Sequence, residues 1–178
     1  MKELLFNKYN IHDGEKITVL DSNEFLCKEL FKLNNNDSEL IVSYNHIKSI
    51  GTSTKIKNWL LKVINNKKEV IIFHNVLSEL DFKDRDIIID TLKGFNNIFI
   101  NITNDVEECL YFDRIIIIYN NKVICDGKTI NVLNEEKLLK RLGYGLPFII
   151  ELNRYLMDYN IINKYYLGND ILVGEIWK

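Results

Sequence analysis

The segment from Glu69 to Asp81, with the sequence EVIIFHNVLSELD, holds the residues that are best placed for chemistry. An apolar run ends at Phe73 and is followed at once by His74 and Asn75, where a buried strand would present side chains at its carboxyl end. A histidine can bind a metal, but no second ligand accompanies His74 at strand or helix spacing. The amide of Asn75 cannot take up a proton as a carboxylate does. The pattern therefore predicts a packed or hydrogen-bonded histidine, with neither a metal site nor a general base.

A second candidate site is the loop DSNEFLCKE over residues 21–29, which follows a predicted strand. A phosphate-binding loop uses glycines to bring backbone amides to the phosphate and a lysine to neutralise it. Asn23 suits such a loop, but Cys27 occupies the lysine position and Lys28 is displaced by one residue, about 100° around a helix. Bulky or acidic residues fill the rest, namely Asp21, Glu24, Phe25, Leu26 and Glu29. We expect a strand, a loop and a helix that do not bind phosphate.

Length, net charge and cysteine content limit the classes of protein to which this chain can belong. The 178 residues are 47% hydrophobic, enough for one domain with a sizeable core, and the net charge of −2 gives no electrostatic footprint for nucleic acid. The three cysteines, Cys27, Cys109 and Cys125, lack CxxC spacing, which indicates reduced thiols. Apolar runs such as 115–118 are too short to cross a bilayer. We expect a cytoplasmic protein that reaches the inner face of a membrane only through partners.

Apolar runs alternate with segments of helical period, which is typical of βαβ units with a mainly parallel sheet. The predicted core strands are Lys16–Leu20, Glu39–Ser43, Glu69–Phe73 and Asn97–Ile102. Two helices are predicted between them from apolar residues at helical spacing. The first helix has Ile56, Trp59, Leu60, Val63 and Ile64 on its apolar face, and the second has Ile87, Ile88, Leu92 and Phe95.

The last third of the chain is predicted to form a hairpin followed by helices. Arg114–Tyr119 and Lys122–Asp126 flank Asn120-Asn121, a predicted hairpin turn because asparagine tolerates positive φ. After Gly127 the chain is predicted to be helical. Its apolar stripe consists of Phe148, Ile149, Leu152, Tyr155, Leu156 and Tyr159. We therefore expect one domain with a C-terminal helical extension.

Several short motifs occur in a familiar order. Residues 69–81 resemble a Walker B strand and D-loop, in which Ser78 and Asp81 match. Residues 50–55, IGTSTK, fall where an LSGGQ signature would lie, and residues 102–105, ITND, are similar to an H-loop. The tail over residues 136–150, EKLLKRLGYGLPFII, looks like that of energy-coupling factor (ECF) transporter ATPases. The chain thus resembles ABC-transporter ATPases, and most closely ECF ATPases, in a shortened and degenerate form.

This resemblance implies a P-loop NTPase-like three-layer α/β fold with a mainly parallel sheet, without most of the helical and antiparallel subdomains. It implies an ATPase-like core over residues 1–130 and a helical extension over residues 131–178. It also implies partners, namely a second ABC ATPase subunit and a transporter membrane scaffold, with the tail helping to pair the two ATPase subunits. A tail that packs only on its own domain is the alternative.

The resemblance also places seven residues at vestigial nucleotide-binding positions: Asn23, Lys28, Asn45, Ser53, Asn75, Asp81 and Asn104. Thr52 or Ser53 could equally be an ordinary helix N-cap, and Asp81 also suits the N-cap of the next helix. The family's P-loop Lys, Walker B Asp, Glu base and H-loop His are all replaced, and phosphoryl transfer depends on such groups. We therefore expect no catalytic residue, metal or cofactor, in an inactive subunit that pairs with an intact ATPase for micronutrient uptake. Two alternatives stay open: a stand-alone binding or regulatory module, and a residual protein that binds ATP with Mg²⁺.

Overall fold

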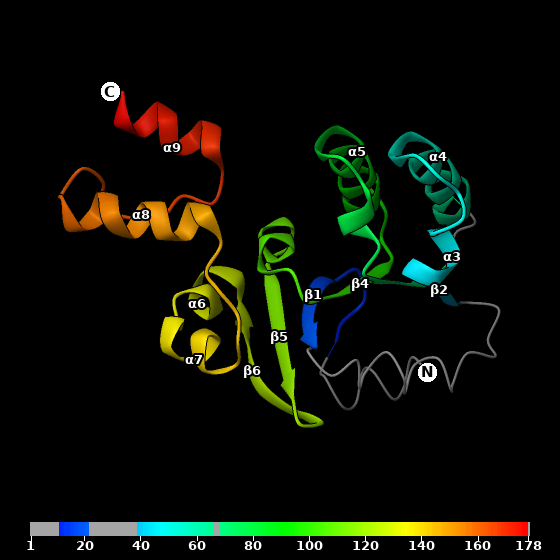
Figure 1. The fold of residues 1–178 in the computed structure, drawn as a ribbon, viewed down its shortest axis with the longest axis horizontal. Coiled ribbons are helices and arrows are strands. Elements are labelled where there is room, and N and C mark those ends of the chain that lie inside the picture. The colour runs from blue at the N-terminus through cyan, green and yellow to red at the C-terminus, as the bar shows by residue number, and fades with distance from the viewer. Residues whose placement is uncertain (1–10, 22–38, 66–67, 178) are drawn as a thin grey trace.

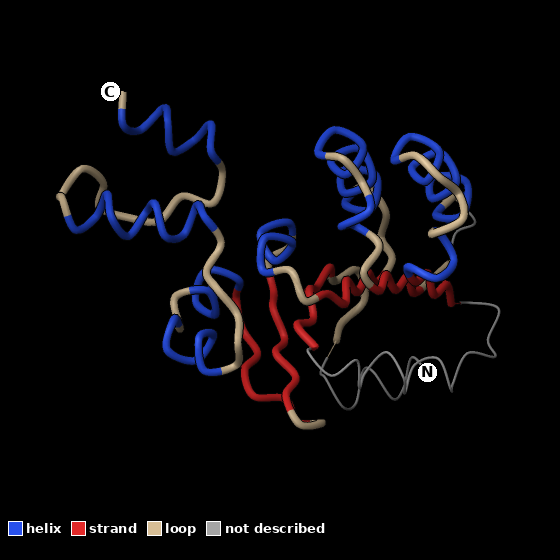
Figure 2. The backbone as a smooth tube through the Cα atoms, viewed as in Figure 1, coloured by secondary structure: helices blue, strands red, loops and turns tan. Residues whose placement is uncertain are grey.

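The computed structural model describes residues 11–21, 39–65 and 68–177, and six strands of this part form one sheet (Figures 1 and 2). The strand order is β2-β3-β4-β1-β5-β6. The first five strands are parallel, and β6 runs antiparallel to β5. The strands are β1 (Lys16–Asp21), β2 (Glu39–Ser43), β3 (Val70–His74), β4 (Ile98–Thr103), β5 (Arg114–Tyr119) and β6 (Lys122–Lys128). The predicted mainly parallel α/β sheet is confirmed.

Helices connect and extend this sheet. Those that lie between or beside the parallel strands are α3 (Tyr44–Ile47), α4 (Ser53–Ile64), η1 (Leu77–Glu79), α5 (Phe82–Lys93) and η2 (Val106–Tyr111). Those of the C-terminal part are α6 (Thr129–Leu133), α7 (Glu136–Arg141), α8 (Phe148–Asp158) and α9 (Asn169–Ile176). Figure 1 shows α3, α4 and α5 on the same side of the sheet, and α8 and α9 at the far end of the molecule from β2.

The predicted strands are all present, but two of them lie one residue later than expected. β3 ends at His74 and β4 ends at Thr103, because backbone pairing continues past the apolar run. His74 pairs with Ser43 on one side and with Ile102 on the other, and Thr103 pairs with Leu20. The polar residues that close each strand are therefore part of the sheet.

The two helices α4 and α5 bury an apolar face against the sheet. Ile56, Leu60 and Ile64 of α4 share one cluster with Phe73 and Phe99, whose rings meet edge to face at 5.0 Å. Burying such side chains contributes roughly 1.5–3 kcal/mol each. This cluster fixes the two helices over β3 and β4.

The predicted apolar face of α5 needs a correction. Ile88 and Leu92 are buried as expected, but Ile87 is 44% exposed and its place in the core is taken by Ile89. Three successive isoleucines leave the helix free to turn either the first or the third toward the sheet. Packing against α4 and the strands places Ile89, and not Ile87, in the core.

The β5–β6 hairpin follows the prediction. Asn120 and Asn121 both have positive φ, 47° and 64°, which matches a two-residue hairpin turn. Arg114 holds the base of the hairpin, since its guanidinium donates 3.0 Å hydrogen bonds to Glu15 and bonds of 2.7 and 2.8 Å to Asp126. The bonds to Asp126, followed by those to Glu15, raise the pKa of Arg114 above its ordinary value.

The C-terminal helices pack on β5 and η2, and the predicted stripe on α8 is only partly right. Ile149 is buried, whereas Phe148, Tyr155 and Tyr159 are exposed. A polar residue, Asn153, is fully buried in their place. Its amide nitrogen donates to the carbonyls of residues 149 and 166 at 2.6 and 2.9 Å, and its oxygen accepts from the amide of residue 166 at 2.8 Å. A count of apolar residues cannot anticipate a polar side chain that is satisfied inside the core.

Candidate functional site at the carboxyl edge of the sheet

The carboxyl ends of parallel strands meet at one edge of the sheet, and three of the predicted site residues follow neighbouring strands there. Asn45 lies in α3 just after β2, Asn75 follows β3, and Asn104 follows β4. Ligands of open parallel sheets bind at this edge. The structure thus brings these three positions to the same edge, with Asn45 and Asn104 exposed and Asn75 half-buried.

Asn75 has a strained backbone that suits its residue type. Its φ is 50°, in the left-handed region that asparagine tolerates better than most residues. Its backbone N–H donates to the carbonyl of Ile102 at 3.0 Å, so the turn is fixed to β4. Its side-chain nitrogen lies 3.3 Å from Nε2 of His74. An imidazole and an amide that contact each other can orient a hydrogen-bonding group but cannot supply two carboxylates for Mg²⁺ and water.

Another charged group at this edge, among the described residues, is the carboxyl group that ends β1. Asp21 ends β1 and is only 2% exposed, so it places a buried carboxyl group at the same edge. Among the residues that the structure describes, no group of three or more His, Cys, Asp or Glu side chains could hold a metal ion. A carboxylate at this position would oppose an anionic ligand.

Ser53 and Asp81 are brought together, but in a contact within the chain. Ser53 is the first residue of α4, and its hydroxyl oxygen accepts a 3.0 Å hydrogen bond from the backbone N–H of Asp81. Asp81 is the N-cap of α5 and accepts a 2.9 Å bond from the N–H of Asp84. The ordinary helix-start interpretation of Asp81 is therefore correct. Thr52, not Ser53, is the N-cap of α4, and its side chain makes no capping bond.

Asp84 joins the same cluster, although it is not among the predicted site residues. The hydroxyl of Ser53 donates to Asp84 at 2.8 Å, and the ammonium of Lys57 donates to it at 2.5 Å. The bond from Lys57 is the main cause that lowers the pKa of Asp84, with Ser53 and Thr54 adding to it. The only hint in the sequence is the spacing of three residues between Asp81 and Asp84, which is typical of a helix start. The partners on α4 are distant in sequence and become visible only in the fold.

Two predicted positions, Asn23 and Lys28, lie outside the described residues, as does the rest of the loop 22–29.

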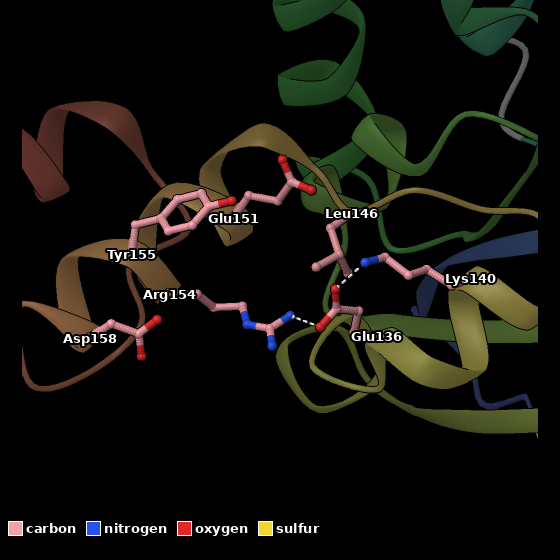
Figure 3. Close-up of a pocket in the computed structure, with 7 residues that line it drawn as sticks. All are labelled: Glu136, Lys140, Leu146, Glu151, Arg154, Tyr155 and Asp158. Atoms are coloured by element: carbon pink, nitrogen blue, oxygen red, sulfur yellow. Dashed lines mark hydrogen bonds and ion pairs between the residues drawn. The ribbon is translucent and has the colours of Figure 1, made fainter.

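A separate surface cavity of about 240 Å³ lies between α7 and α8 (Figure 3). Glu136 stands between two cations there, since it accepts from Lys140 at 2.5 Å and also pairs with Arg154. Hydrogen bonds, first from Lys140 and then from Arg154, lower the pKa of Glu136. The pair with Arg154 joins α7 to α8 at the surface, whereas the pair with Lys140 lies within α7. No helix in the described part of the chain combines the length and the apolar character needed to cross a membrane.

Comparison with known proteins finds relatives among the ATP-binding proteins of ECF transporters. The chain is 28% identical over 121 residues to the energy-coupling factor transporter ATP-binding protein EcfA1 of Listeria monocytogenes, a match that covers 65% of this chain and 43% of the relative. It is 26% identical over 134 residues to EcfA of Malacoplasma penetrans, covering 73% and 47% of the two chains. It is 30% identical over 114 residues to EcfA1 of Mycoplasmopsis synoviae, covering 62% and 41%. The chain spans less than half the length of these curated relatives. No family model matches it.

Two solved structures have the same fold. CbiO1 from Clostridium perfringens, part of the ABC transporter complex cbiONQ, aligns with a TM-score of 0.52 and 16% identity over 83% of this chain and 89% of that chain. An ATP-bound bacterial Atm1-family ABC exporter aligns with a TM-score of 0.51 and 9% identity over 70% of this chain and 35% of that chain. At these identities the likeness shows the fold alone. In sequence this chain is thus similar to the ATP-binding proteins of ECF transporters, and in fold to ABC ATPases.

Proposed function

We propose that this chain is an ATPase-like subunit of an ECF-type micronutrient transporter that does not hydrolyse ATP and that pairs with an intact ATP-binding subunit. The similarity to ECF ATP-binding proteins supports the general class. The proposal as a whole rests most on the end of β3, where His74 and Asn75 contact each other and no carboxylate directly follows the strand.

The chemistry of this site supports inactivity. Phosphoryl transfer proceeds by positioning and charge stabilisation, which in this family requires a metal-binding carboxylate and a group that activates water. Removing a general base alone costs typically 10²–10⁴-fold in rate. Two further candidate polar groups, Ser53 and Asp81, are engaged with α5. A nucleotide would have to compete with these internal bonds.

Exposed aromatic side chains at the C-terminal end support pairing with another subunit. Tyr155 is 63% exposed, Tyr159 is 77% exposed and Trp177, just after α9, is 83% exposed. Aromatic side chains of this kind supply much of the binding energy at protein interfaces. The finer assignment, an intact ECF ATP-binding subunit as partner, comes from the resemblance of the tail.

Co-expression with an intact ECF ATP-binding protein, followed by size-exclusion chromatography with light scattering, tests the pairing. We expect a one-to-one complex that is lost when Tyr155 and Trp177 are both replaced by serine. The matched control is Tyr119→Ser at the tip of the β5–β6 hairpin, where the tyrosine is 38% exposed. A chain that stays monomeric beside every ECF ATP-binding protein offered would favour a stand-alone module and overturn the proposal.

A further inference from the structure

The short helix η2 lies between the end of β4 and the first turn of α8. It begins just after Asn104 and Asp105, and its two adjacent glutamates point to different partners. Glu107 is exposed, whereas Glu108 is fully buried. The two side chains therefore connect one turn of helix to two separate parts of the fold.

The contact of Glu108 fixes η2 to the sheet. Its carboxyl group accepts a 2.7 Å hydrogen bond from the side-chain amide of Asn101, which is also fully buried in β4. The neighbouring Cys109 is buried in the same apolar cluster as Ile149 and Ile150 of α8. The inner face of η2 thus touches both the sheet and the tail.

The contact of Glu107 fixes the start of α8. Its carboxylate accepts a 2.7 Å hydrogen bond from the backbone N–H of Phe148, the first residue of that helix. The first amides of a helix have no partner within the helix, and a carboxylate there also interacts favourably with the helix dipole. Glu107 therefore supplies a cap for α8 from another element 41 residues earlier in the chain.

Further bonds make the turn continuous with β4. The N–H of Asp105 donates to the hydroxyl of Thr103 at 3.0 Å, and the carboxylate of Asp105 accepts from the N–H of Glu107 at 2.9 Å. The N–H of Glu108 donates to the carbonyl of Asp105 at 3.2 Å. An unbroken series of hydrogen bonds thus runs from Thr103 at the end of β4 to Phe148 at the start of α8.

We infer that η2 is a conformational coupling element between the carboxyl edge of the sheet and the C-terminal helices. A ligand or partner that moves Asn104 or Asp105 changes the order of the first turn of α8, and a partner that moves α8 changes the order of residues 104–108. Such coupling must be equal in both directions. It is a property of this chain alone and does not depend on whether ATP is bound or hydrolysed.

Amide hydrogen exchange on the full chain tests the inference with one variant at each end. Asp105→Ala removes the cap of η2 on the sheet side, and we expect exchange in residues 149–152 of α8 to rise roughly fivefold, the size expected for a lost cap. Glu107→Ala removes the cap of α8, and we expect a similar rise both in α8 and in residues 105–108. Both side chains lie at or near the surface, so both variants should fold.

Glu79→Ala is the control, because Glu79 is an exposed glutamate in the other short helix, η1. It should leave exchange at both ends unchanged. If Asp105→Ala accelerates exchange only in η2 and Glu107→Ala only in α8, the two caps act locally and the inference is overturned. If Glu79→Ala accelerates amide exchange equally in residues 105–108 and in α8, the inference is overturned as well.

Discussion

The hydroxyl of Ser53 and the carboxylate of Asp84 are joined by a 2.8 Å hydrogen bond, although the two residues lie in the first turns of different helices. The bond holds α4 and α5 together above the sheet, where Lys57 adds a charged contact to the same carboxylate. Ser53 is the residue that resembles part of the family's signature. In this chain it stabilises the packing of two helices.

Replacing Asp84 tests this packing role. We expect Asp84→Asn to lower the urea midpoint clearly more than Asp90→Asn, an exposed control on the same helix, because it leaves the Lys57 ammonium without its charged partner. The folded pKa of Asp84 is lowered, so its stabilisation is complete above its ordinary pKa near 3.8 and is lost as the pH falls through the lowered value. Asp84→Asn should therefore flatten the acid limb of the stability profile. Equal midpoints for the two variants would contradict this account.

For Glu108 we expect the opposite dependence of folding stability on pH. Burial raises its pKa above the ordinary value of 4.5, Asp105 adds to that rise, and Asn101, Thr103 and Arg85 oppose it. The folded state then holds more protons than the unfolded state, so stability is greatest below pH 4.5 and falls as the pH rises through the folded pKa. One proton limits the slope to about 1.4 kcal/mol per pH unit.

Glu108→Gln keeps a side-chain oxygen for the bond from Asn101 and removes the titration. We expect the variant to be more stable than the wild type at about pH 8 and equal or less stable at about pH 4, by thermal or urea unfolding. Glu79→Gln should follow the wild type at both pH values. A wild-type-like slope in Glu108→Gln would show that Glu108 is ionised in the folded state.

The positive φ of Asn75 allows a prediction of which residue types are tolerated at position 75. Its φ of 50° costs a β-branched residue roughly 1–2 kcal/mol but costs glycine little. Asn75→Val should therefore be less stable than Asn75→Gly by about that amount. Both variants lose the side-chain contact with His74, so the loss of that contact cancels in the comparison. Equal free energies of unfolding would mean that the turn relaxes to another conformation.

Phe73 and Phe82 form a matched pair for the core. Phe73 is fully buried against Phe99, and Phe82 at the start of α5 is 71% exposed. Phe73→Ala should cost about 3–5 kcal/mol of unfolding free energy. Phe82→Ala should change it by less than about 0.5 kcal/mol. Comparable losses at the two positions would contradict the placement of the core between the sheet and the two helices.

The strands could be predicted because long apolar runs have few alternatives in a buried parallel sheet. Their ends could not, since His74 and Thr103 are polar and are held by pairing with neighbouring strands. The hairpin turn was predictable from Asn120-Asn121, because the chemistry of asparagine fixes the backbone locally. The orientation of α5 was not, because Ile87 and Ile89 are equivalent by composition.

The candidate site was predictable only in part. The strand order places Asn45, Asn75 and Asn104 at one edge of the sheet. The order of the motifs along the chain is enough to predict this placement. The contacts of Asp84 with α4 and of Glu107 with α8 join residues 31 and 41 positions apart. They depend on how helices pack after the sheet has formed, so no local pattern reveals them.

Turnover of Mg-ATP by the purified full chain tests the central claim most directly. Phosphate release should equal that of buffer, beside an intact ECF ATP-binding protein as positive control, and calorimetric titration with Mg-ATP should give no binding heat. Phosphate release above buffer that disappears in Lys28→Ala, or ATP binding with micromolar affinity, would contradict the account.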